Sequence, residues 1–268
     1  MFSVKESKLS YKGASLSYRK MGHGEVVVLL HGFGEDGSIW DGISQALCDQ
    51  YQVIVPDIAG SGLSTMLPEE NLSMTDFADS IAAILNKEKI QRCTMIGHSM
   101  GGYITLAFAE KHPEMLKAFG LFHSSAYADD EVKKEMRTKA IGFIKERGAL
   151  VFLKTSIPSL FADDKKSDAH ISLLVEKSKA FAPEALIQYY QAIKNRPDRT
   201  EVLTKTRCQV LMILGEQDKA VPFELGLKQA HLPDISHVHV LRNSGHMGML
   251  EEPEKSLFIL QQFLEANY

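Results

Sequence analysis

Cysteine and tryptophan are scarce in this chain of 268 residues, which has three cysteines and one tryptophan. Cys48, Cys93 and Cys208 are far apart, odd in number and each set in an apolar segment. We therefore expect buried free thiols, because a disulfide framework or a CxxC metal site needs paired or closely spaced cysteines. No apolar run approaches the roughly 18 residues of a membrane span, and the first residues lack a secretion-signal pattern. These features predict a cytoplasmic protein without a membrane span.

An excess of positive charge is also missing, because the formal net charge is -4. Such a chain has no overall field that would attract a phosphate backbone, so we expect no nucleic-acid partner. The sequence contains no dinucleotide fingerprint, no metal-ligand cluster and no phosphate loop, since Gly97 to Gly102 lacks the lysine of a Walker motif. We therefore expect no cofactor and no metal. Hydrophobic residues at 44% and charged residues at 24% are values typical of a globular protein.

Short apolar runs rich in β-branched residues recur along the chain, with helical stretches between them. This pattern predicts an α/β fold with a mostly parallel sheet flanked by helices. Two polar-alternating strands around Tyr11 to Gly13 predict an antiparallel hairpin at one edge. The predicted parallel strands are Val26 to Leu30, Val53 to Val55, Thr94 to Ile96, Phe119 to Phe122, Val210 to Leu214 and Val238 to Leu241.

The strand and helix alternation stops between about Ala126 and Pro197, where apolar residues follow helical spacing instead. We interpret the chain as one α/β core, residues 1–125 and 198–268, interrupted by a helical cap of residues 126–197. Such an insertion can cover the end of the sheet where ligands bind.

Helix starts and stops are legible in several places. Ser38 with Asp41, and Ser73 with Asp76, fit capping boxes ahead of apolar-periodic segments. Pro113 is predicted to end the helix that follows Ser99.

The strongest chemical signal is Gly97-His98-Ser99-Met100-Gly101-Gly102, a G-x-S-x-G between a predicted strand and a predicted helix. A serine in this strained turn presents its hydroxyl to solvent, and the two glycines let the strand and the helix approach each other. A glycine-rich turn without function is the alternative reading. The strand, turn and helix context favours a nucleophilic Ser99.

A serine nucleophile needs a base, and His246 follows the last predicted strand, from which its loop can reach Ser99. Asp218, on the loop after the preceding strand, is the candidate that orients His246 and stabilises its charged form. Glu216 is a local rival, and Asp129 and Asp130 are rivals at another strand. Asp129 and Asp130 sit several residues beyond the end of their strand, which favours Asp218.

Glycines follow the strand that ends at Leu30, in the segment His31-Gly32-Phe33-Gly34. Such a loop can aim a backbone N–H at a developing oxyanion, and we predict the N–H groups of Phe33 and Met100 as the two donors. His31 is predicted to brace the loop.

The chain resembles an α/β-hydrolase of the esterase and meta-cleavage-product hydrolase type over nearly its whole length. The resemblance implies that Asp57 and the glycines after it form a structural turn, and that residues 126–197 form a cap over the substrate pocket. The motifs that carry it are His31 to Gly34, Asp57 to Ser64, Gly97 to Gly101, Gly215 to Asp218 with Val221-Pro222, and Gly245-His246 followed by Leu250 to Pro253.

We predict a serine carboxylesterase that cleaves a small or medium ester, a small-molecule substrate, through an acyl-enzyme. Relatives resembling dehalogenases and epoxide hydrolases carry aspartate where this chain has Ser99, which disfavours those reactions. A carbon-carbon hydrolase of meta-cleavage products is the alternative enzyme, although that subgroup tends to have a tryptophan soon after the histidine, where this chain has Met247. Thioester, amide and perhydrolysis activities stay open, as does a hydrolase-fold small-molecule receptor.

Overall fold

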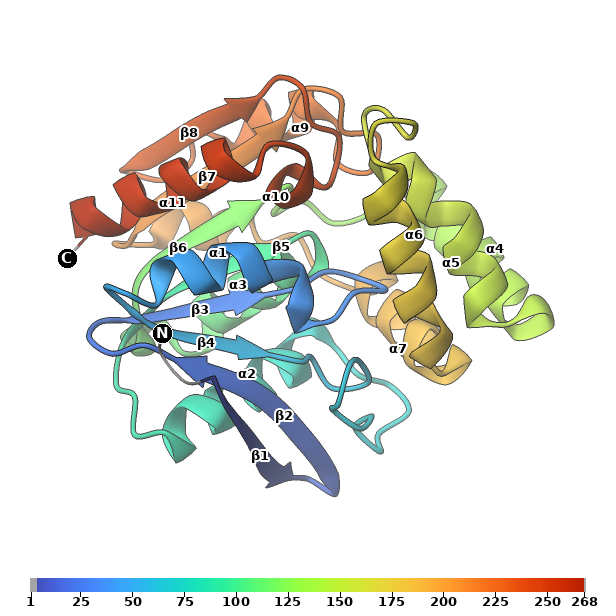
Figure 1. Cartoon of the computed structure of the whole chain (residues 1–268), viewed down its shortest axis with the longest axis horizontal. Helices are drawn as coiled ribbons and strands as arrows, with labels where there is room; N and C mark the ends of the chain where they lie inside the picture. Colours follow the sequence, from blue (N-terminus) through green and yellow to red (C-terminus); the bar gives the residue numbers. More distant parts are fainter. Residues whose placement is uncertain (1–3, 268) are drawn as a thin grey trace.

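The computed structural model describes residues 4–267, which form an eight-stranded sheet in the order β1-β2-β4-β3-β5-β6-β7-β8 (Figure 1). The first two strands form an antiparallel hairpin, and β2 joins it to β4 in an antiparallel pairing. All later neighbours are parallel. The strands are β1 Lys5–Tyr11, β2 Ala14–Met21, β3 Val26–Leu30, β4 Gln52–Pro56, β5 Cys93–His98, β6 Leu116–Phe122, β7 Gln209–Gly215 and β8 Ser236–Leu241.

Burial explains why the central strands consist of continuous apolar residues. The residues of β5 are all buried, as are four of the five in β3 and six of the seven in β7. A parallel strand covered by helices on both faces has no solvent side, so it contains no alternating polar residues. Each predicted parallel strand lies within one of β3 to β8, the predicted edge hairpin is β1 and β2, and the α/β prediction is confirmed.

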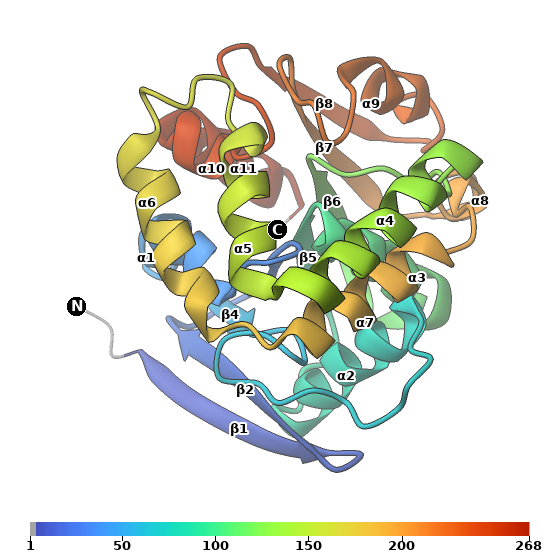
Figure 2. The same cartoon turned by 90° about the vertical axis from the view of Figure 1, so that its right-hand side faces the viewer.

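Helices cover both faces of the sheet. Figure 2 shows α1 and α11 on one face and α2 and α3 on the other. The helices of the described chain that belong to these layers or to the loops around them are α1 Asp41–Leu47, α2 Met74–Lys87, α3 Met100–Lys111, α8 Thr200–Lys205, α9 Phe223–Gln229, α10 Gly248–Glu251 and α11 Pro253–Asn267.

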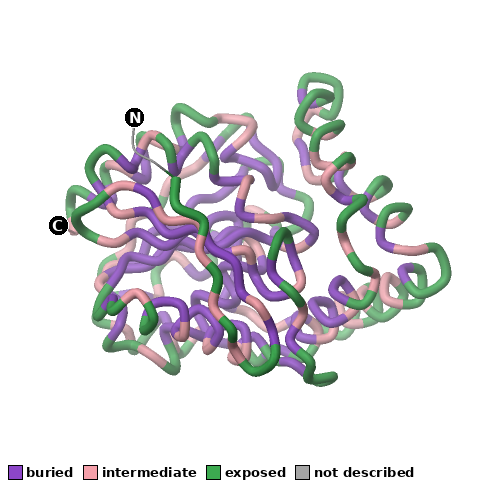
Figure 3. The backbone as a smooth tube through the Cα atoms, turned by 60° about the horizontal axis from the view of Figure 1, so that its bottom comes forward, coloured by how far each residue is buried: buried purple, intermediate pink, exposed green. Residues whose placement is uncertain are grey.

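A separate group of helices lies between β6 and β7 in the sequence and beyond the carboxyl ends of the parallel strands in space (Figure 1). The burial colouring of Figure 3 shows much of the outer helical group exposed, whereas the central strands are buried. Residues 126–197 therefore contain helices in this position, and their role as a cap stays a prediction. The helices are α4 Glu131–Arg147, α5 Ala149–Ser156, α6 Asp168–Lys177 and α7 Pro183–Lys194.

The helix starts follow the predictions in part. Ser73 and Asp76 form a capping box at the start of α2, and α3 ends at Lys111, just before Pro113. The predicted box of Ser38 with Asp41 is wrong. A 3-10 helix of residues Gly37–Trp40 precedes α1, and its cap is Asp36, whose carboxylate accepts from the Ser38 N–H at 2.9 Å. The helical turn therefore starts earlier than Ser38, which lies inside it.

The three cysteines are free, as predicted, and Cys48 and Cys93 are buried. Cys208 is only half-buried, because it precedes β7 at the edge of the core. Within residues 4–267, no helix combines the length and the apolar character that crossing a membrane requires.

Candidate active site

Ser99 lies at the turn between β5 and α3, with φ +50° and ψ −114°. This conformation is costly for a residue with a side chain, and such strain is concentrated at functional sites. The neighbouring glycines explain how the turn closes. A Cβ on Gly97 would lie 2.2 Å from the Gly101 carbonyl oxygen, and one on Gly101 would lie 2.6 Å from the Leu30 carbonyl oxygen. Only glycine at both positions lets β5, α3 and β3 come this close.

Hydrogen bonds from the next strand hold the Ser99 backbone. Its N–H donates to the Phe122 carbonyl at 3.0 Å, and its carbonyl accepts from the Ser124 hydroxyl at 2.7 Å. Met100 follows as the first residue of α3, where an amide N–H has no partner within the helix. The Ser99 backbone is therefore held from both sides, and the Met100 N–H has no acceptor within α3.

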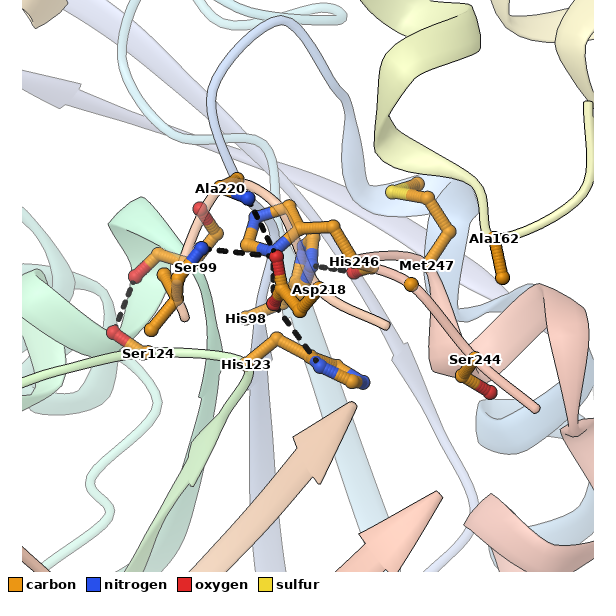
Figure 4. Close-up of polar contacts among 12 residues, drawn as sticks. His98, Ser99, His123, Ser124, Ala162, Asp218, Ala220, Ser244, His246 and Met247 are labelled. Carbon is orange, nitrogen blue, oxygen red and sulfur yellow. Dashed lines mark hydrogen bonds and ion pairs between the residues drawn. The ribbon is translucent and has the colours of Figure 1, made fainter. Parts of the chain in front are cut away.

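His246 and Asp218 meet as the sequence predicts. The His246 Nδ1 lies 2.7 Å from Asp218 Oδ2, and both side chains are almost fully buried (Figure 4). The other carboxylate oxygen accepts the N–H groups of Ala220 and Val221 at 2.8 and 2.9 Å. Since Asp218 occupies Nδ1, the Nε2 of His246 is the nitrogen available to accept a proton.

The electrostatic setting keeps Asp218 ionised. Burial alone would raise its pKa, but the charge and hydrogen bond of His246, together with the nearby His123 ring, outweigh burial and lower the pKa far below its ordinary value. Of the rival acids, Asp129 instead pairs with Arg137 and Arg196. Glu216 is exposed at the surface. Asp218 alone among the acids considered contacts His246.

His123 is a neighbour of this pair that the sequence analysis missed. It follows β6 with φ +49°, it is buried, and its Nδ1 lies 3.4 Å from Asp218 Oδ2. Burial lowers the pKa of His123 to about 4, so the ring is neutral at pH 7. Neither ring nitrogen of His123 has a hydrogen-bond partner among the described residues, so this neutral ring lies beside Asp218 without displacing His246 from it. The sequence does carry a signal for His123, because this residue directly follows a predicted strand that neighbours the strand before Ser99.

Glu35 and His98 form a second buried pair, which connects three segments of the site. Glu35 Oε2 accepts from the Gly32 N–H at 2.7 Å and lies 3.0 Å from His98 Nδ1. The Nε2 of His98 donates to the His246 carbonyl at 2.9 Å. Burial opposes charge on both partners, yet their mutual attraction lowers the pKa of Glu35 and raises that of His98. An ion pair thus links the glycine loop, the serine turn and the histidine loop.

The loop that carries His246 is held from the other side by Glu251. Its carboxylate accepts the N–H groups of Gly245 and Met247 at 2.9 and 3.1 Å, and that of Ala162 at 2.7 Å. The His246 N–H itself donates to the Leu160 carbonyl at 2.6 Å. The acidic motif after the histidine therefore ties its loop to the segment between α5 and α6.

The glycine loop after β3 lies where the sequence predicts. His31 braces it, since Nε2 accepts the Ile58 N–H at 2.9 Å and Nδ1 lies 2.8 Å from the Gly32 carbonyl. Phe33 stacks on Tyr190 of α7, with ring centroids 4.1 Å apart. Among the hydrogen bonds of residues 4–267, neither the Phe33 N–H nor the Met100 N–H has a protein acceptor.

One cavity brings these parts together. It encloses about 100 Å³ and is lined mainly by apolar side chains from α5, the segment after it and α7. Ser99, His246 and Phe33 line it from the α/β core, whereas Asp218 lies behind His246 and not in its lining. The cavity can hold a small group against the serine and the histidine.

The side chains of His123, Asp218 and His246 offer three ligand atoms within 4.8 Å of one another, the only such metal-capable group within residues 4–267. Asp218 and His246 use two of these atoms for their own hydrogen bond. The arrangement is therefore that of a carboxylate holding an imidazole in a fixed tautomer.

Known proteins resemble this chain along nearly its whole length. The family model of the "Alpha/beta hydrolase family" matches residues 27–257. A thermophilic esterase from Thermogutta terrifontis, solved with malate bound, superposes with a TM-score of 0.91 at 27% identity and covers 98% of each chain. The pimeloyl-(acyl-carrier protein) methyl ester esterase of Aeromonas hydrophila is 27% identical, over 93% of this chain and 99% of its own. A 2-hydroxy-6-oxo-6-(2'-aminophenyl)hexa-2,4-dienoic acid hydrolase of Metapseudomonas resinovorans is 26% identical, over 90% and 84%.

Proposed function

Because the chain belongs to the alpha/beta hydrolase family, we propose that it is a serine carboxylesterase that cleaves a small or medium ester. The observation that carries the proposal is the shared cavity. It is lined by a serine held in a strained turn and by a histidine whose Nδ1 is fixed by a buried aspartate at 2.7 Å. The esterases among its relatives support the same reaction class.

In the first half-reaction the Ser99 hydroxyl attacks the ester carbonyl carbon. The Oγ–C bond forms as His246 Nε2 takes the hydroxyl proton, and Asp218 stabilises the resulting imidazolium. The Phe33 and Met100 N–H groups donate to the oxyanion of the tetrahedral intermediate. When the ester C–O bond breaks, His246 returns the proton to the departing alcohol, and the acyl group stays on Ser99.

In the second half-reaction water takes the place of the alcohol. His246 removes one proton from the water as its oxygen attacks the acyl carbon, and the same oxyanion donors act again. Breakdown of this intermediate breaks the bond to Ser99, whose oxygen recovers a proton from His246, and releases the acid.

We propose that residues 126–197 act as the cap over this reaction. Leu153 and Ile157 of α5 and its following turn, with Tyr190 and Ile193 of α7, form much of the apolar lining. Such a lining favours a short apolar substituent and excludes bulk water from the acyl-enzyme.

Hydrolysis of p-nitrophenyl esters of increasing acyl length, by the wild type and by Ser99→Ala in parallel, tests the proposal. We expect repeated turnover by the wild type, a preference for short acyl groups, and a loss of several orders of magnitude in Ser99→Ala, up to about 10⁶-fold. Equal turnover by both proteins would contradict the proposal, and a flat acyl-length profile would contradict the size of the pocket.

The carbon-carbon hydrolase is the second candidate, supported by the dienoic acid hydrolase among the relatives. Met247 lines the cavity next to His246, so the tryptophan typical of that subgroup is replaced by a flexible apolar side chain. Turnover of a dienone acid without turnover of any ester would favour this candidate. A single slow turnover with a large ligand-induced rise in melting temperature would favour a receptor.

A further inference from the structure

The cavity beside Ser99 contains one cationic side chain that the proposed reaction does not use. Arg137 of α4 lines the cavity together with Ser99 and His246. Among the described residues of that lining it is the only lysine or arginine, and the only carboxylate is Glu35, which already pairs with His98 at 3.0 Å. A permanent positive charge in a largely apolar pocket needs an explanation.

The charge of Arg137 is only partly balanced by the protein. Its Nε lies 3.3 Å from Asp129 Oδ2, but Asp129 Oδ1 is engaged by Arg196 Nη1 at the shorter distance of 2.9 Å. Both Asp129 and Arg196 are buried, with side chains 1% and 5% exposed. One carboxylate therefore serves two guanidinium groups, and the cluster carries a net charge of about +1.

Arg196 makes further contacts inside the protein, although its Nε has no hydrogen-bond partner among the described residues, whereas Arg137 lines the cavity. Arg196 donates to the carbonyls of Ile193 and Tyr127 at 2.9 Å each, and its guanidinium lies 3.9 Å from the Tyr103 ring centroid. The side chain of Arg137 is 28% exposed, and within the described chain its one hydrogen bond to a carboxylate uses Nε. Neither Nη group of Arg137 has a carboxylate partner within residues 4–267, so the surplus positive charge of the cluster resides on Arg137.

The aromatic residues fix where this guanidinium lies. Its Cζ is 5.2 Å from the centroid of the Tyr190 ring, and Tyr190 stacks on Phe33 of the glycine loop. One wall of the cavity is thus formed by Phe33, the predicted oxyanion donor, followed by Tyr190 and Arg137. A planar guanidinium held by an aromatic face is preorganised for bidentate contact with a carboxylate.

We propose that the natural substrate is an ester that carries a second, ionised carboxylate, which Arg137 binds through its Nη groups while Ser99 attacks the ester carbonyl. A monoester of a short dicarboxylic acid has this chemistry. This inference rests on the proposed esterase function and adds the substrate class to it. The apolar lining then holds the carbon chain between the two polar ends.

The test compares monomethyl esters of dicarboxylic acids of increasing length with methyl esters of length-matched monocarboxylic acids. The measured quantity is the ratio of kcat/KM for the charged ester to that for its neutral partner, in the wild type, Arg137→Gln and Arg137→Lys. Lys139→Gln is the matched control, since it removes one positive charge from the same helix at an exposed position paired with Glu135.

We expect Arg137→Gln to lower this ratio by roughly 10- to 100-fold, which is the change in affinity expected when a hydrogen bond to a charged group is lost. Arg137→Lys should restore the ratio in part, because lysine keeps the positive charge but lacks the planar group that makes two parallel hydrogen bonds. Lys139→Gln should leave the ratio unchanged. Arg137→Gln should fold, because Asp129 keeps its bond to Arg196, and its melting temperature checks this. A ratio that does not change in Arg137→Gln, or that falls equally in Lys139→Gln, would overturn the inference.

A readout that is independent of turnover separates this inference from the proposed function. Titration calorimetry of the free dicarboxylate product should give a Kd roughly 10- to 100-fold weaker for Arg137→Gln than for the wild type. If esters are hydrolysed by a Ser99-dependent route but neither the ratio nor the product Kd depends on Arg137, only the substrate class is wrong. If no ester is hydrolysed, the proposed function fails and this substrate class fails with it.

Discussion

Replacing Asp218 by asparagine tests how the site holds His246, and the structure fixes the expected direction. The Oδ1 of Asp218 accepts two backbone N–H groups, from Ala220 and Val221, and this contact orients any amide at this position with its oxygen toward them. The amide NH₂ of Asp218→Asn then faces His246 Nδ1, which must accept instead of donate. The proton of the neutral ring moves to Nε2, the nitrogen that has to receive the Ser99 proton.

The size of the loss follows from this wrong tautomer. The corresponding change in a serine-protease triad lowers kcat by about 10⁴-fold, with the geometry intact. We expect a loss of this order in kcat on a short p-nitrophenyl ester, with a melting temperature close to that of the wild type. Glu216→Gln is the matched control, because this exposed carboxylate lies two residues away, and its activity should stay within about twofold. An Asp218→Asn enzyme that keeps more than about a tenth of the activity would refute the reasoning.

Two further predictions concern the framework around the site. Gly97→Ala should destabilise the protein by about 1–3 kcal/mol or more, because its Cβ would lie 2.2 Å from the Gly101 carbonyl oxygen. Gly142→Ala should stabilise it by about 0.5–1 kcal/mol, because this exposed position of α4 has no atom within 4 Å of the added Cβ. Equal shifts of the melting temperature in the two variants would contradict this prediction. Glu35→Gln should cost about 3–5 kcal/mol by leaving His98 unpaired. Because the pKa of Glu35 is lowered on folding, its contribution to the unfolding free energy is complete above its ordinary pKa of 4.5. Because the pKa of His98 is raised on folding, its contribution is complete below its ordinary pKa of 6.5 and is lost at higher pH. The difference in unfolding free energy between wild type and Glu35→Gln should therefore be largest between about pH 4.5 and 6.5, and a difference that grows above this window would contradict the ion pair.

The sequence predicts the fold and the central contact of the site because both depend on local signals. Continuous β-branched runs reveal buried parallel strands, and the strained G-x-S-x-G turn needs glycines at fixed spacing. Asp218 and His246 follow neighbouring strands, whose carboxyl ends meet at one edge of the sheet. That topology is enough to predict that the two side chains lie close together.

The remaining features depend on contacts between distant segments. Glu35 and His98 are 63 residues apart, and neither stands out by spacing, yet they pair in the interior. Arg137 is one of several basic residues on α4, and only the packing of α4 against α7 places it in the cavity. The wrong cap prediction at Ser38 has a local cause, since Asp36, two residues earlier, caps the helical turn instead.

Covalent labelling with a fluorophosphonate, followed by intact mass measurement and peptide mapping, tests the central claim most directly. A nucleophilic Ser99 activated by His246 should give a single adduct per chain, located on Ser99. The adduct should be absent in Ser99→Ala and much slower to form in His246→Ala, while Glu216→Gln labels like the wild type. Labelling at another residue, or undiminished labelling of Ser99→Ala, would contradict the assignment of Ser99 as the nucleophile.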